Sequence, residues 1–220
     1  MAEALNEKFA ALHAERERTW PAEQLAKNIE IRSGLVRKYN PRNHVQIGEI
    51  VDPFTLIDSD GKSLTRDDLL RNGPAVLIFF RFGTCPACNV ALPHYDRFLA
   101  PALAAAGVPL IAVSPQAPVD PTLKERHGLS VTVASDGNNI LGDRLGITFE
   151  PDERPEVKPG ESWIGSVTGT NSWTLPQPTV LILNADATVR FIEVSPDWMK
   201  RTEVDRILSQ LPELRAAAAA

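Results

Sequence analysis

Two cysteines, Cys85 and Cys88, are the only thiols in the 220-residue chain and carry its clearest chemistry. The two residues between them place the sulfurs one helical turn apart, close enough to cycle between dithiol and disulfide. Two cysteines are too few for a disulfide-stapled scaffold or a four-cysteine zinc or iron–sulfur site. The pair therefore predicts thiol redox chemistry. An inert buried pair and half of a metal site are the alternative interpretations.

A strand and a helix are needed to position this pair. The apolar run 75–80 has the length of a strand buried on both faces of a sheet, and a helix is expected over roughly 86–103. Cys85 then lies at the N-terminus of the helix, where unpaired N–H groups and the helix dipole favour a thiolate. Pro86 suits the first turn, because its missing N–H would be unpaired there anyway.

Strands and helices alternate around this unit. Further strands are predicted over 54–57, 110–113 and 131–133. Helices are expected between them, over 65–70 with Thr65 as its cap, between 121 and 128, and over 139–145. Such alternation is typical of right-handed βαβ units around a parallel sheet.

The second half of the chain departs from this alternation. Residues 148–177 are rich in Pro, Gly, Ser and Thr and are expected to form a long loop insertion, with a lid over the site as one hypothesis. The runs 179–183 and 189–192 predict a β-hairpin. A last helix is expected to start near Thr202, whose spacing to Asp205 is a variant of the capping box, and the alanines 216–220 are expected to fray.

Residues 1–44 are expected to be an N-terminal helical extension of a domain that spans 45–215. Apolar residues recur there at helical spacing, and Trp20-Pro21 separates two amphipathic helices. The apolar faces of these helices can cover the main domain or join two copies as a homodimer, and the sequence leaves this choice open.

Composition excludes several classes of function. With 23 Lys and Arg against 28 Asp and Glu, the net charge of −5 gives no basic surface for nucleic acid. No apolar run is long enough to span a bilayer, and charges near the N-terminus break any signal-peptide core. We expect a cytoplasmic protein without a membrane partner. No metal or cofactor is expected, because His94 points away from the pair on its helix and His44 and His127 are distant in sequence.

Two prolines add a resemblance to a known fold. Pro93 stands five residues after Cys88, and Pro178-Thr179 precedes the apolar residues 180–183. Together with the strand, the C-x-x-C pair and the helix, this order resembles the thioredoxin-like α/β fold, a central mixed sheet with helices on both faces. The resemblance implies a cis peptide bond before Pro178, and it implies that Pro178 and Thr179 shape the substrate groove beside the sulfurs.

Longer stretches resemble the peroxiredoxin-like branch of the alkyl hydroperoxide reductase and thiol-specific antioxidant family. The matching segments are Asp52-Pro53-Phe54-Thr55-Leu56, 79–89, 111–116, 176–179 and 189–198. The resemblance covers roughly residues 45–211. It implies an antioxidant peroxidase that is regenerated by a thioredoxin- or glutaredoxin-type reductant.

The chain also departs from the family's P-x-x-x-T-x-x-C pattern. Placing Cys88 on the peroxide-reactive cysteine puts Cys85 at the threonine and Arg81 at the proline. An ungapped count from Val189-Arg190 puts Arg201 on the family's thiolate-activating arginine, and a solvated residue beside a helix cap is the favoured alternative. Thr84 replaces a tryptophan common before the first cysteine, so a smaller and more polar mouth is expected.

Two enzymatic mechanisms and one without turnover fit these residues. In the first, a thiolate reduces hydrogen peroxide or an organic hydroperoxide and the neighbouring thiol forms a disulfide with it. In the second, Cys85 attacks a protein or small-molecule disulfide and Cys88 resolves the mixed disulfide. The third is a redox sensor. The family resemblance makes Cys88 the first sulfur to react, whereas helix-terminus electrostatics makes it Cys85.

Overall fold

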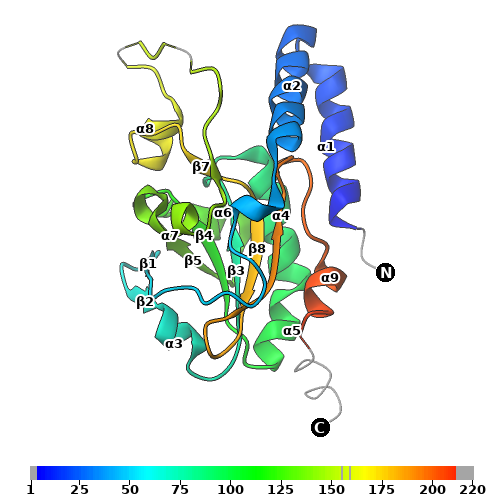
Figure 1. Ribbon diagram of the computed structural model, residues 1–220. Helices are drawn as coiled ribbons and strands as arrows, with labels where there is room; N and C mark the ends of the chain where they lie inside the picture. Colours follow the sequence, from blue (N-terminus) through cyan, green and yellow to red (C-terminus); the bar gives the residue numbers. More distant parts are fainter. Residues whose placement is uncertain (1–3, 155, 159, 212–220) are drawn as a thin grey trace.

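A seven-stranded sheet forms the centre of the computed structural model, which describes residues 4–154, 156–158 and 160–211 (Figure 1). The strand order is β2-β1-β5-β4-β3-β8-β9. The strands are β1 (Thr55–Asp58), β2 (Ser63–Thr65), β3 (Ala75–Phe79), β4 (Leu110–Ser114), β5 (Thr132–Ser135), β8 (Thr179–Leu183) and β9 (Val189–Val194). Strands β3, β4 and β5 pair in parallel, and the outer strands pair antiparallel, so the sheet is mixed, as predicted.

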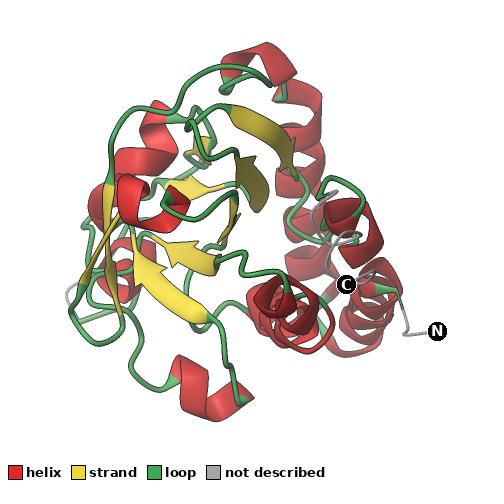
Figure 2. Ribbon diagram, turned by 90° about the horizontal axis from the view of Figure 1, so that it is seen from below, coloured by secondary structure: helices red, strands yellow, loops and turns green. Residues whose placement is uncertain are grey.

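Helices cover both faces of this sheet (Figure 2). One face packs against α1 (Leu5–Thr19), α4 (Pro86–Phe98), α5 (Ala100–Ala105), α6 (Leu123–His127) and α9 (Val204–Leu208). The other packs against α3 (Arg66–Leu70) and α7 (Ile140–Arg144). Side chains of β3 alternate between the two cores, with Val76 and Ile78 on the first and Leu77 and Phe79 on the second. This arrangement confirms the thioredoxin-like fold.

The N-terminal helices α1 and α2 (Ala22–Lys38) stand side by side at one end of the molecule, and a short turn, η1 (Pro41–Asn43), follows them (Figure 1). Leu5 and Phe9 of α1 are buried in the same core as Cys85 and Cys88. The apolar face of α1 therefore packs on the chain's own cysteine-bearing core.

The start of α1 lies beside α9 (Figure 1). The Glu203 carboxylate accepts hydrogen bonds from the Leu5 and Asn6 N–H groups, each at 2.9 Å, and so satisfies two unpaired donors of the helix terminus. Glu203, not Thr202, is the residue before α9, and no side chain caps that helix. The predicted last helix is present as α9, but the predicted cap at Thr202 is wrong, because Glu203 stands at the cap position and its side chain bonds to the start of α1.

Several other boundaries differ from those expected. The single helix predicted over 86–103 is two helices, α4 and α5, because Pro101 in the first turn of α5 has no N–H to continue the helical bonding. Thr65 caps α3 as predicted, with its hydroxyl accepting the Asp68 N–H at 3.1 Å. The strand at Ser63–Thr65 was not predicted.

Residues 148–177 contain structure of their own. Strands β6 (Thr148–Phe149) and β7 (Leu175–Pro176) pair antiparallel at the base of the segment, and α8 (Ile164–Thr168) lies between them. The short η2 turn (Gly137–Asn139) precedes α7. The predicted fraying of Ala216–Ala220 falls outside the described residues. None of the described helices is long and apolar enough to cross a membrane.

Candidate active site

The two cysteines lie where β3 gives way to α4. Cys85 is the residue that caps α4, and Pro86 occupies the first helical turn, as predicted. The Gln116 side chain beyond β4 accepts the Gly83 N–H at 2.9 Å, which holds the connecting turn in place. Both sulfurs are free thiols, and both residues are buried, Cys85 at 2% exposure and Cys88 at 0%.

The pKa values of the two thiols move in opposite directions. A hydrogen bond from the Cys88 thiol lowers the pKa of Cys85 most, and the charges of Arg81 and Arg201 and the Cys88 backbone N–H add to this effect. Burial alone would raise this pKa, but the other effects are larger, and the pKa of Cys85 is about 5. Burial and the neighbouring Cys85 raise the pKa of Cys88 well above that of an ordinary thiol. The pair therefore shares one proton, with the negative charge on Cys85 and the proton on Cys88.

Arg201 is buried and is not a solvated residue. It is 7% exposed, and its guanidinium lies 5.1 Å from the Phe9 ring and donates a hydrogen bond to the Lys200 carbonyl at 2.7 Å. Its charge lowers the pKa of both thiols. The alternative of an exposed arginine beside a helix cap is therefore wrong.

Two further arginines near Cys85 were not predicted as site residues. Arg16 of α1 is buried, contacts the Met199 sulfur at 3.3 Å and experiences the charge of Cys85. Arg81 lies with its guanidinium 4.5 Å from the Trp198 ring. The sequence held a signal for Arg16, because it stands seven residues after Phe9 and so shares the apolar face of its helix.

Pro178 and Thr179 are buried and line a small cavity together with Arg201 and Tyr95. The predicted cis peptide bond before Pro178 is wrong, since the cis bond among the described residues is Ala117–Pro118. Pro178 instead continues the extended chain into β8, with its carbonyl accepting the Ser195 N–H at 2.8 Å beside the β8–β9 ladder. Thr84 and Pro86 are exposed and lie at the outer side of the cysteine turn.

No group of three or more His, Cys, Asp and Glu side chains among the described residues could hold a metal ion. His94 is buried and packs against the Phe98 ring at 4.8 Å, and His44 bonds to Tyr39 at 3.0 Å. The site that these residues define is one of thiol chemistry on a thioredoxin-like scaffold.

The comparisons with known proteins agree with this class. Residues 47–192 match the family model described as the AhpC/TSA family. The match spans well over half of the chain, so the chain belongs to the AhpC/TSA family. At this level it is an oxidoreductase of the peroxiredoxin type. Among curated proteins, none matches the chain by sequence.

Solved structures show the same fold. The peroxidoxin BcpB from Mycobacterium tuberculosis superposes with a TM-score of 0.58 at 20% identity, over 79% of this chain and 98% of that one. A peroxiredoxin-like protein from Aquifex aeolicus gives 0.58 at 18% identity, over 78% and 88% of the two chains. Peroxiredoxin 6 of Arenicola marina gives 0.57 at 21% identity, over 79% and 72%.

Proposed function

We propose that the protein is a thiol-dependent peroxidase that reduces hydrogen peroxide or organic hydroperoxides through a Cys85–Cys88 dithiol–disulfide cycle. The observation that carries this proposal is the placement of two free thiols one turn apart at the start of α4, where the Cys88 thiol and the charges of Arg81 and Arg201 lower the pKa of Cys85. A thiolate is the nucleophile that peroxide reduction needs, and the second thiol stands ready to resolve the product.

The first step consumes one peroxide. The Cys85 thiolate attacks the terminal peroxide oxygen, the O–O bond breaks, and the leaving alkoxide or hydroxide takes up a proton to become an alcohol or water. Cys85 is left as a sulfenic acid. Arg81 and Arg201 act as positioning residues here, because their charges keep Cys85 ionised inside an apolar core.

The second step uses the adjacent thiol. Cys88 attacks the Cys85 sulfenic acid, an S–S bond forms, and water leaves. A dithiol reductant of the thioredoxin or glutaredoxin type then exchanges with the disulfide and restores both thiols, becoming oxidised itself. The disulfide form must expose Cys85 for this exchange, since Cys85 is 2% exposed in the dithiol form that the structure shows.

Burial of the pair also favours the peroxidase over the second candidate function, that of a thiol–disulfide oxidoreductase. The lowered pKa on the first cysteine favours attack on a disulfide, as in the C-x-x-C oxidoreductases. A protein disulfide, however, needs an exposed sulfur in the dithiol form, where Cys85 is buried, whereas a small peroxide needs only a narrow opening. In our proposal residues 1–44 act as a cover for a domain spanning 45–215, which limits access to small oxidants.

A thiol titration with hydrogen peroxide tests the proposal. In the wild type, micromolar peroxide should remove two thiols per peroxide within seconds. The Cys88→Ser variant should accumulate a sulfenic acid that dimedone traps, and Cys85→Ser should not react. A requirement for millimolar peroxide, or a reactive Cys85→Ser variant, would contradict the peroxidase. Reduction of insulin disulfides by the wild type but not by Cys85→Ser would support the oxidoreductase instead.

A further inference from the structure

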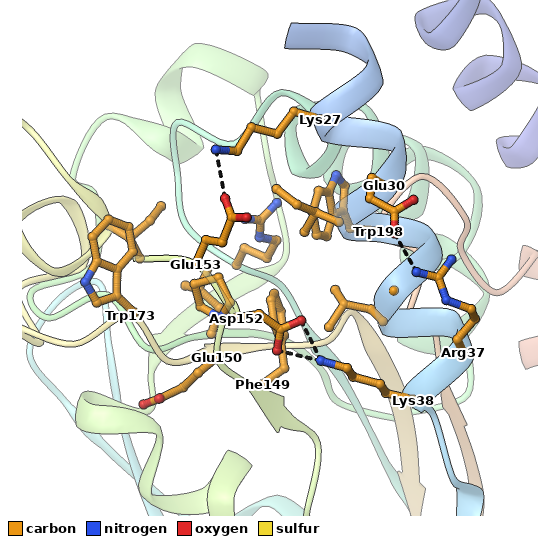
Figure 3. Close-up of a pocket in the computed structure, with 17 residues that line it drawn as sticks. Lys27, Glu30, Arg37, Lys38, Phe149, Glu150, Asp152, Glu153, Trp173 and Trp198 are labelled. Atoms are coloured by element: carbon orange, nitrogen blue, oxygen red, sulfur yellow. Dashed lines mark hydrogen bonds and ion pairs between the residues drawn. The ribbon is translucent and has the colours of Figure 1, made fainter. Parts of the chain in front are cut away.

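A cavity of about 690 Å³ lies between α2 and the segment 149–175 (Figure 3). Its volume is that of a small-molecule site. The apolar part of its wall comes from both elements and from the turn before Arg201. These side chains are Ile31, Leu35, Phe149, Ile164, Trp173, Leu175 and Trp198. The cavity therefore offers an apolar chamber for a ligand of low polarity.

The basic side chains of α2 at this cavity are paired with carboxylates. Figure 3 shows ion pairs that join Lys27 to Glu153, Lys38 to Asp152 and Arg37 to Glu30. The nitrogen–oxygen distances in these pairs are 3.1, 2.5 and 2.5 Å, respectively. All three pairs are largely exposed, so each contributes little stability and opening them costs little. They neutralise the outer wall and leave it without a net attraction for ions.

Arg81 is the exception among the cations that line the cavity. Within the described residues its guanidinium makes no hydrogen bond or ion pair, and its Nε is buried without a partner. The guanidinium lies 4.5 Å from the Trp198 ring and 5.4 Å from the Phe82 ring. A planar cation beside two aromatic rings, with no hydrogen-bond partner on its Nε, is suited to a carboxylate, which accepts two parallel N–H bonds.

We propose that this cavity binds a small apolar carboxylate, with its chain among the apolar walls and its carboxylate on Arg81. The apolar walls and the single unpaired cation match a ligand with an apolar body and one negative charge. This inference goes beyond the peroxidase, because the ligand needs no reaction at the cysteines.

The bound carboxylate is coupled to the cysteine pair through Arg81. The positive charge of Arg81 helps to keep Cys85 ionised, and a carboxylate on Arg81 would neutralise that charge. The ligand should therefore lower the reactivity of Cys85. By linkage, removing the thiolate should strengthen ligand binding by the same factor. The disulfide form, which has no thiolate, should bind the carboxylate more tightly than the reduced form.

Calorimetric titration with octanoate tests the site, with octanol as the uncharged probe of equal length. The wild type should bind octanoate at one saturable site and bind octanol more weakly. Arg81→Met should weaken octanoate about tenfold, the loss expected for a charge-assisted hydrogen bond, and leave octanol unchanged. Arg97→Met is the matched control, since Arg97 also lies over an aromatic ring, 5.2 Å from Phe98, but does not line the cavity.

A second variant tests the proposal even if the Arg81→Met protein does not fold. Leu35→Trp places a larger side chain in the cavity from α2 and should abolish binding of both probes. Octanoate should also slow alkylation of Cys85 in the wild type and bind more tightly to the disulfide form. Octanoate affinity that survives Leu35→Trp, equal losses in Arg81→Met and Arg97→Met, or octanol binding as tight as octanoate would overturn the proposal. None of these readouts requires peroxidase turnover.

Discussion

Replacing Cys88 tests how much the hydrogen bond from its thiol contributes to the lowered pKa of Cys85. Its thiol is the largest contribution to the lowered pKa of Cys85. A hydrogen bond to a charged group is worth about 1.5–3 kcal/mol, which corresponds to about one to two pKa units. Cys88→Ser keeps an O–H donor at this position, and Cys88→Ala removes it. The pKa of Cys85 should therefore stay near 5 in the serine variant and rise to about 6–7 in the alanine variant.

The rate of alkylation by iodoacetamide as a function of pH measures this difference. Each variant contains one thiol, so the midpoint of the profile belongs to Cys85. At about pH 5, roughly half of the sulfur is ionised in Cys88→Ser and only about 1–10% in Cys88→Ala. Val90→Ala, a truncation on the same helix, should leave the first acid midpoint of the wild type unchanged. Equal midpoints in the serine and alanine variants would show that the Cys88 hydrogen bond does not stabilise the thiolate, and the reasoning would be refuted.

Three other predictions concern the residues around the pair. Arg201→Met should raise the alkylation midpoint of Cys85 by less than Cys88→Ala does, because the charge of Arg201 is a smaller contribution; a larger rise would contradict this order. Glu203→Ala should lower the free energy of unfolding in urea by about 1–2 kcal/mol, since two N–H groups of α1 lose their acceptor, whereas Glu153→Ala at an exposed ion pair should cost less than about 1 kcal/mol. Between about pH 7 and about pH 5, the reduced wild type should lose about 2 kcal/mol more stability than Cys85→Ser. The folded pKa of Cys85 lies below its unfolded value, so its stabilisation is complete only above the ordinary thiol pKa and disappears as the pH falls through about 5. Parallel stability profiles of the two proteins would refute this assignment.

The sequence predicted the central fold because its signals there are local. The run 75–80 is apolar on every residue, and β3 is buried on both faces. Cys85-Pro86 marks the start of α4. Proline has no N–H to donate, so it fits the first helical turn and leaves Cys85 at the helix terminus. Patterns of this kind depend only on neighbours within one turn or one strand, so contacts with distant segments do not change the structure that they predict.

The sequence did not predict the features that depend on contacts between distant segments. The acceptor for the α1 terminus comes from Glu203, 198 positions away from Leu5, and no local pattern indicates it. Arg16 reaches Cys85 only because α1 packs over the core of the domain. The expectation for Pro178 relied on a family pattern, and the β8–β9 ladder imposes an ordinary extended chain there instead.

The hydrogen bonds between Glu203 and the start of α1 also affect the order of events on the ribosome. Leu5 is synthesised 198 residues before the Glu203 carboxylate that accepts its N–H. Until then, α1 has no anchor at its first turn, and the thiols at 85 and 88 are synthesised without their cover. A nascent chain is therefore open to oxidation at Cys85 while the residues between it and Glu203 are being added, and the cover is anchored only when Glu203 reaches the start of α1.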